Sequence, residues 1–125
     1  MSTLAAARTR ATVAVSDLTR ARAFYADTLG LHVSEERPGA ITCSCGDGTM
    51  LDVYESAAAG TAKTTVASFE VADLAAVMSE LRSRGVVFDS FGAPAVDDAV
   101  ERDGIRGSWF HDPDGNVLAV VQHTL

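Results

Sequence analysis

The sequence predicts a small α/β protein that is built from two copies of one structural unit. The segment Val15-Ser16-Asp17-Leu18 recurs as Val71-Ala72-Asp73-Leu74, and a helical pattern follows each copy. Each half later contains an aspartate–glycine turn signal between strand-like runs, at Asp47-Gly48 and at Asp114-Gly115. The order of these features is the same in both halves, which indicates an internal duplication.

One predicted helix follows each recurring segment. Asp17 and Asp73 are placed to accept hydrogen bonds from free N–H groups of the helix that follows and to complement its dipole. Gly30 and Gly85 suit the left-handed residue that closes a helix. Apolar residues lie between these limits at close to helical spacing: Leu18, Ala21, Phe24, Tyr25 and Leu29 in the first half, and Leu74, Val77, Met78 and Leu81 in the second.

Seven strands are predicted from short runs of β-forming residues. They are Arg10–Val15, Ala40–Cys45, Met50–Glu55, Val66–Val71, Val86–Phe88, Ser108–His111 and Val117–Gln122. The stretch from Glu55 to Lys63 is interpreted as the linker between the halves. The stretch from Ala93 to Gly107 is predicted to be a loop, long enough to act as a lid or an interaction surface.

Composition indicates one compact domain over residues 1–125 and excludes several classes of partner. The hydrophobic fraction is 47% and the charged fraction 22%, as in ordinary globular domains. The net charge is −7 and no basic run is present, which argues against nucleic acid as a partner. No apolar run is long enough to span a membrane, and no secretory signal is recognised, so we expect a cytoplasmic protein.

Two long segments carry a resemblance to a known family. The run from Val15 to Tyr25, with Leu29-Gly30-Leu31 after it, resembles the first module of the vicinal oxygen chelate (glyoxalase/bleomycin resistance/dioxygenase) superfamily. The segment from Trp109 to Leu118 resembles the end of its second module. The resemblance implies an α+β fold of two tandem βαβββ modules, at about 8–58 and 62–125, that form a curled mixed sheet around a cavity. It also implies a homodimer, with the site near or across the subunit interface.

The resemblance allows a test for the metal site of the family's metal-dependent members, which place four ligands, usually two His and two Glu, at matching positions. Here these positions fall on Arg10, Asp52, Val66 and Ala119. Arginine, valine and alanine do not ligate metals, and a single aspartate does not hold a first-row ion tightly. We therefore expect no metal and no other cofactor.

Strand parity predicts which side chains face the ligand cavity. The candidate ligand-binding residues are Arg10, Thr12, Asp52, Tyr54, Ser68, Glu70, Trp109 and His111. Met50 and Val66 are expected to complete the apolar wall. Aromatic and apolar walls with few polar groups suit an organic ligand. The alternative is that Arg10 forms a structural ion pair with Asp52 or Glu70 and that the cavity is filled.

The two cysteines and the three histidines give weaker indications. A two-residue turn at Asp47-Gly48 would pair Cys45 with Met50 and Cys43 with Asp52, which places both thiols on the cavity face. Buried, unreactive thiols are the favoured interpretation, over redox chemistry or a soft-metal site. His32 and His123 are expected at the surface, whereas His111 is expected either to point into the cavity or to cap the turn that follows it.

Three functions remain open from the sequence. The favoured one is a metal-free small-molecule-binding protein that sequesters an antibiotic or a metabolite. The alternative is an enzyme of the same fold, a lyase, isomerase or dioxygenase-like protein that acts on a small organic substrate with a non-standard metal or none. Without a metal it could use Asp52 or Glu70 as a base and Arg10 to stabilise an oxyanion. The third is an interaction dimer with a vestigial cavity.

Overall fold

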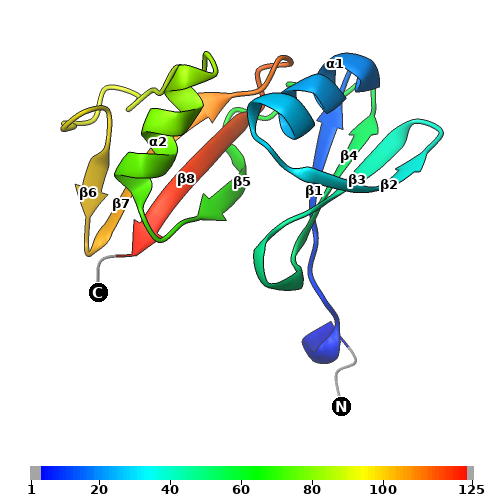
Figure 1. The fold of residues 1–125 in the computed structure, drawn as a ribbon, viewed down its shortest axis with the longest axis horizontal. Coiled ribbons are helices and arrows are strands. Elements are labelled where there is room, and N and C mark those ends of the chain that lie inside the picture. Colours follow the sequence, from blue (N-terminus) through cyan, green and yellow to red (C-terminus); the bar gives the residue numbers. More distant parts are fainter. Residues whose placement is uncertain (1–3, 124–125) are drawn as a thin grey trace.

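The computed structural model describes residues 4–123 and contains two four-stranded sheets, each accompanied by a helix (Figure 1). The strand order is β1-β4-β3-β2 in the first sheet and β5-β8-β7-β6 in the second, and in each sheet only the first pair is parallel. The two modules therefore share one βαβββ topology, which confirms the predicted α+β fold. The elements are β1 (Ala11–Val15), α1 (Leu18–Arg22), β2 (His32–Arg37), β3 (Ala40–Ser44), β4 (Met50–Glu55), β5 (Thr65–Glu70), α2 (Leu74–Ser83), β6 (Val100–Arg102), β7 (Ile105–His111) and β8 (Val117–His123).

Both helices begin and end at the predicted signals. The side chains of Asp17 and Asp73 each accept a hydrogen bond of 3.1 Å from the backbone N–H three residues later. Gly30 and Gly85 both have positive φ. The first helix continues beyond α1 through a π-helical segment, η2 (Ala23–Thr28). No helix between residues 4 and 123 is long and apolar enough to cross a membrane.

Three strand assignments differ from the prediction. Residues 86–88 form no strand: Val86 and Phe88 are buried in the core, but backbone pairing with β7 starts only at Asp89. β2 was not predicted because its residues are mostly polar and exposed, so it shows no alternation. β6 lies inside the predicted loop Ala93–Gly107 and joins β7 through a two-residue turn at Asp103-Gly104.

The register of the β3–β4 hairpin also differs from the prediction. Ser44 pairs with Met50 and Thr42 with Asp52, because the turn contains three residues, Gly46–Gly48, and not two. A shift of one residue exchanges the faces of a strand. The side chains of Thr42 and Ser44 therefore take the face that was expected for the two cysteines, and Cys43 lies in the core.

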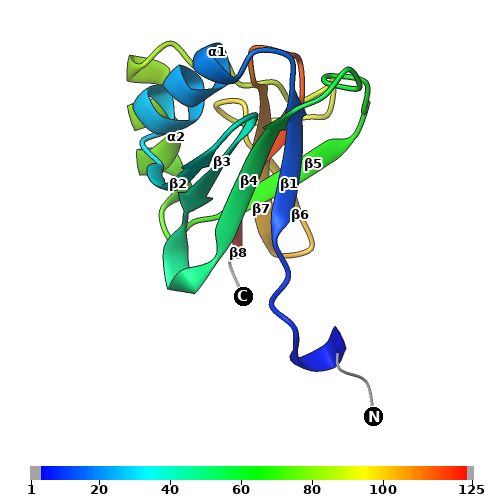
Figure 2. The same cartoon turned by 90° about the vertical axis from the view of Figure 1, so that its right-hand side faces the viewer.

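One hydrophobic core serves both modules. Residues from the helix-covered faces of both sheets, such as Val53 in β4 and Phe110 in β7, belong to a single buried cluster. Phe24 of η2 packs on Phe110, with 6.5 Å between ring centroids. Both helices lie on the same side of the sheets, toward this core (Figure 2). Each sheet thus keeps one face that no helix covers, and the two uncovered faces point outward, away from the shared core.

Polar side chains fix the junction between the modules. The Tyr25 hydroxyl donates a 2.7 Å hydrogen bond to Asp112, whose carboxylate also accepts bonds from the backbone and side chain of Asn116. Asp114 accepts hydrogen bonds from Ser16 and forms a 3.0 Å ion pair with Arg20. Burial acts to raise the pKa of Asp114, but the bonds from Ser16 and Arg20 outweigh it and hold this pKa below its usual value. The Asp112–Asn116 turn is therefore bonded to the first module from several directions.

We expect Tyr25→Phe to lower the free energy of unfolding by about 1–3 kcal/mol, because it removes a hydrogen bond from a buried carboxylate. Urea denaturation followed by circular dichroism measures the change. Tyr54→Phe is the matched control: this tyrosine is 40% exposed, and the same change should cost less than about 0.5 kcal/mol. Equal effects of the two substitutions would show that the Tyr25–Asp112 bond does not hold the modules together.

Candidate functional site

Four polar side chains form a connected group on the uncovered face of the first sheet. Asp52 Oδ1 accepts hydrogen bonds of 2.6 Å from Arg10 Nη2 and 2.6 Å from Thr42 Oγ1, and Arg37 Nη2 lies 3.9 Å from the same oxygen. Arg10 Nη2 also lies 3.2 Å from Thr42 Oγ1. We call these four residues, Arg10, Arg37, Thr42 and Asp52, the Asp52 network. The register places them together, because Thr42 pairs with Asp52 across β3 and β4.

The Asp52 network keeps free hydrogen-bonding atoms that face solvent. The side chains of Arg10 and Asp52 are 42% and 19% exposed. Within residues 4–123, Asp52 Oδ2 accepts no hydrogen bond from the protein, and neither Nε nor Nη1 of Arg10 donates one. The site therefore offers one carboxylate oxygen and two guanidinium nitrogens, Nε and Nη1, to a ligand.

Asp52 is held in its charged form. Burial acts to raise its pKa, but the hydrogen bonds from Thr42 and Arg10, and the charges of Arg10 and Arg37, outweigh this and lower the pKa. A carboxylate with a lowered pKa is a good hydrogen-bond acceptor and a weak proton acceptor at neutral pH. Asp52 is thus better suited to binding a donor group than to general base catalysis.

Two other predicted residues lie next to the Asp52 network. Thr12 pairs with Asp52 across β1 and β4, and Tyr54 lies two positions further along β4 on the same face. A small cavity of about 100 Å³ adjoins Arg10 and includes Met50 among its walls. The first sheet therefore brings together Arg10, Thr12, Asp52 and Tyr54, as predicted from strand parity.

The other four predicted residues lie on the uncovered face of the second sheet. Ser68 and Glu70 are exposed on β5. Trp109 and His111 lie two positions apart on β7, so their side chains share one face of the strand. Trp109 Nε1 donates a 3.1 Å hydrogen bond to Thr65 Oγ1. His111 does not cap the following turn, which is closed by hydrogen bonds to Asp112.

The two groups of predicted residues lie on different sheets. No hydrogen bond, ion pair or ring contact within residues 4–123 links the Asp52 network to Trp109 or His111. The physical reason is the shared core, which draws the covered faces together and leaves the uncovered faces outside. Val66 was expected in the cavity wall, but a register shift between Thr65 and Ala67 leaves it packed against the core.

The positions that hold a metal in metal-dependent members of the family do not fit one here. Arg10, Val66 and Ala119 lack metal-binding atoms, and Asp52 Oδ1 already accepts two hydrogen bonds. No group of three or more His, Cys, Asp or Glu side chains with metal-binding geometry occurs in the part of the chain that the structure describes.

The two thiols lie in different environments. Cys43 is fully buried, and burial raises its pKa to about 11. Burial also raises the pKa of Cys45, which is partly exposed at the start of the turn. Reactive cysteines have lowered pKa values, so the structure gives neither thiol the properties of a nucleophile.

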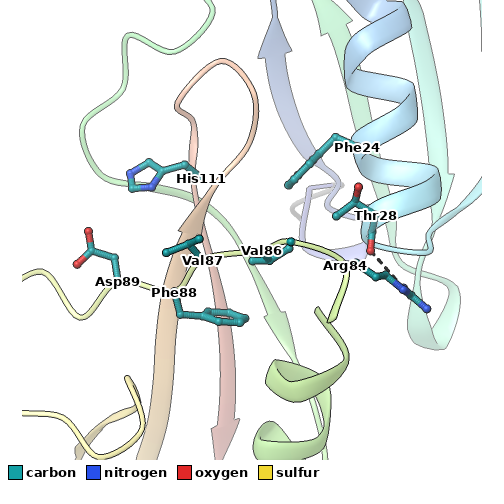
Figure 3. Close-up of a pocket in the computed structure, with 9 residues that line it drawn as sticks. Phe24, Thr28, Arg84, Val86, Val87, Phe88, Asp89 and His111 are labelled. Carbon is teal, nitrogen blue, oxygen red and sulfur yellow. Dashed lines mark hydrogen bonds between the residues drawn. The ribbon is translucent and has the colours of Figure 1, made fainter. Parts of the chain in front are cut away.

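A larger cavity, of about 470 Å³, lies where the helical segment of the first module meets the second module (Figure 3). Phe24 and Thr28 form one side, and the segment 84–89 and His111 form the other. Arg84 at its edge is already engaged, because Nη1 donates to the Thr28 carbonyl and Nη2 pairs with Glu80. This cavity includes only His111 among the predicted residues, and sequence patterns gave no indication of it.

Sequence reasoning missed three residues that contribute to the uncovered faces. Thr42 was assigned to the wrong face by the hairpin register, although Ile41 and Cys43 alternate with Thr42 and Ser44 as a half-buried strand should. Arg37 was missed because β2 was not predicted. Phe91, which contacts Trp109 and His111, has no sequence signal of its own.

Comparisons with known proteins agree with this architecture. The model of the Glyoxalase/Bleomycin resistance protein/Dioxygenase superfamily matches residues 8–120. TnmS3, an antibiotic binding protein from Streptomyces sp. CB03234, is 26% identical; the alignment covers 94% of this chain and 98% of TnmS3, with a TM-score of 0.74. A glyoxalase/bleomycin resistance protein from Catenulispora acidiphila DSM 44928 is also 26% identical, with coverages of 92% and 96% and a TM-score of 0.68.

A third solved structure shares the fold at lower identity. The bleomycin resistance determinant encoded on the transposon Tn5 is 23% identical, with coverages of 95% and 99% and a TM-score of 0.75. A search of curated proteins found no match.

The lowered pKa of Asp52 gives a test of the Asp52 network. A pH titration of the carboxyl carbon chemical shift of Asp52 should show a midpoint below the ordinary value of about 3.9. In Arg10→Ala the midpoint should rise, because one hydrogen bond and one positive charge are lost. Because the folded-state pKa is the lower one, the stability from this network is present above about pH 4 and disappears as the pH falls through the folded pKa. An unchanged midpoint in Arg10→Ala would contradict the assigned geometry.

Proposed function

Because the chain belongs to the glyoxalase/bleomycin resistance protein/dioxygenase superfamily, we propose that it is a metal-free protein that binds a small organic molecule and sequesters an antibiotic or a metabolite. The observation that carries the proposal is the Asp52 network, in which Arg10 and Asp52 are fixed but keep free hydrogen-bonding atoms on an uncovered sheet face. The similarity to TnmS3, an antibiotic binding protein, supports the same class of function.

The free atoms suggest the polar chemistry of the ligand. Nε and Nη1 of Arg10 suit a carboxylate or phenolate, and Asp52 Oδ2 suits an amine or hydroxyl, through charge-assisted hydrogen bonds. Trp109 suits a flat ring: its N–H is already bonded to Thr65, so the ring faces are its remaining contact surface. The proposed ligand is therefore an aromatic or polycyclic molecule with both donor and acceptor groups.

Catalysis is the less favoured alternative. Of the two carboxylates considered as a general base, Asp52 has a lowered pKa and is bonded to Arg10 and Thr42. A general base acts best when its pKa lies near the working pH. Ligand binding without catalysis requires only the charged form of Asp52, which the lowered pKa favours.

We propose further that two chains assemble into a homodimer and complete the site. No hydrogen bond, ion pair or ring contact joins the Asp52 network to Trp109 or His111 within residues 4–123, and a second chain would place the first sheet of one subunit opposite the second sheet of its partner. A twofold arrangement would make two equal sites. Exposed apolar side chains on these faces, including Tyr54 and Ile105, support burial against a partner.

Ligand binding can be tested with the single tryptophan, because Trp109 fluorescence reports on its own site. A library of aromatic and polycyclic metabolites and antibiotics should contain compounds that shift Trp109 emission and raise the melting temperature together. Arg10→Ala and Asp52→Ala should weaken binding of these compounds about ten-fold or more, as expected for lost charge-assisted hydrogen bonds, with an unchanged circular dichroism spectrum. A library without any such compound would refute the proposed function.

The proposed homodimer can be tested by sedimentation at micromolar protein concentration, which should give twice the chain mass.

A mixing experiment then tests whether the site is shared, using Asp52→Ala and Trp109→Ala, each of which should bind weakly alone. If the two variants are unfolded and refolded together, half of the dimers are mixed and each mixed dimer has one intact site, so about a quarter of the sites should recover full affinity in calorimetry. A monomer, or no recovery on mixing, would place the whole site within one chain.

A further inference from the structure

Phe91 occupies a backbone position that does not suit a bulky residue. The Ala93 N–H donates a 3.1 Å hydrogen bond to the Ser90 carbonyl, and both central residues of this turn have positive φ, 52° at Phe91 and 80° at Gly92. Turns of this kind, type I′, are dominated by Gly, Asn and Asp. A large side chain with this φ is an outlier that the local sequence does not favour. Some other interaction must account for a phenylalanine here.

The hydrophobic core does not account for it. The Phe91 side chain is 53% exposed, and it lies outside the buried cluster that contains Phe88 and Phe110. Among the described residues 4–123, its ring contacts other aromatic rings at Trp109 and His111, with centroid separations of 5.6 and 5.8 Å and interplanar angles of 68° and 71°. The backbone N–H of Phe91 donates a 2.7 Å hydrogen bond to Asp89 Oδ1, which holds the turn in place.

Phe91, Trp109 and His111 form a partly open group of rings, which we call the aromatic corner. Trp109 and His111 lie two residues apart on β7, so their side chains share the uncovered face of the second sheet. Phe91 reaches this group from the segment that follows Asp89, which pairs with Trp109 at the edge of the sheet. The turn thus carries an exposed phenylalanine onto the face where we placed the ligand.

We propose that Phe91 is a ligand-contacting residue and that the aromatic corner is the subsite for a planar aromatic ring. This inference rests on the proposed function. The ligand ring packs against the exposed surface of Phe91 and against Trp109, and the polar groups of the ligand reach the Asp52 network across the dimer. Aromatic rings interact best with other aromatic rings in offset or edge-to-face contacts, so the aromatic corner selects planar aromatic ligands over aliphatic ones of similar size and charge.

The alternative explanation is that Phe91 only covers Trp109 and supports the fold. The two explanations predict opposite effects of Phe91→Asn. If the ring is present for the ligand, asparagine relieves the unfavourable φ, and the melting temperature stays the same or rises while binding weakens. If the ring supports the fold, the same substitution lowers the melting temperature and leaves the affinity unchanged.

The experiment uses two primary amines as probes, 9-aminoacridine, which is planar and aromatic, and 1-aminoadamantane, which is aliphatic and compact. Wild-type protein should bind 9-aminoacridine, detected by Trp109 quenching and by calorimetry, more tightly than 1-aminoadamantane. Phe91→Asn should weaken 9-aminoacridine binding about two- to twelve-fold, the range for one lost aromatic pair, and Phe91→Tyr should keep the affinity within about two-fold. Val96→Asn is the matched control, because Val96 is also an exposed apolar residue, at 73%, in the segment after α2; it should not change the affinity.

Two results overturn the inference and leave the proposed function standing. One is equal affinity of Phe91→Asn and wild type for 9-aminoacridine. The other is that wild-type protein does not bind 9-aminoacridine but binds library compounds through Arg10 and Asp52. If wild type binds neither probe and no library compound, the proposed function itself fails, and the inference fails with it.

Discussion

The structure depends on the joining of the two modules through one hydrophobic core, fixed by the Asp112–Asn116 turn. Tyr25 reaches this turn from the first module, and the Asn116 side chain donates a 2.8 Å hydrogen bond back to the Ala14 carbonyl. Since the covered faces of both sheets are used in this core, the uncovered faces must lie outside. The Asp112–Asn116 turn therefore helps to fix how the two sheets are placed in one chain.

The Asp52 network places a charge pair at two positions where the resemblance implies metal ligands in metal-dependent members of the family. The Arg10 guanidinium lies 2.6 Å from the Asp52 carboxylate. Such an ion pair has a smaller desolvation penalty at a partly exposed face than in the core, because solvent still reaches both groups. The remaining free atoms of this charge pair are the ones to which the proposed function assigns the polar groups of the ligand.

The sequence predicted the features that local interactions determine. The helix starts at Asp17 and Asp73 and the helix ends at Gly30 and Gly85 depend on residues close in the chain, and they were right. The Asp47-Gly48 turn was wrong in length, although Asp103-Gly104 does form a two-residue turn, so the dipeptide alone does not fix the register. Strand parity predicted which of the candidate residues share a sheet face, but the placement of the two faces depends on long-range packing, which no local pattern encodes.

The aromatic corner illustrates why part of a site escapes sequence reasoning. Phe91 breaks the local preference of its turn, and it makes no contribution to the hydrophobic pattern of a strand or helix. Residues under selection for folding alone tend to agree with their local backbone, so a disagreement of this kind points to another requirement. The same reasoning separates Phe91 from Phe88, only three residues earlier, whose buried ring packs on Phe110 at 5.7 Å and needs no function beyond stability. A half-exposed residue with an unfavourable φ is therefore the more informative of the two about the proposed ligand site.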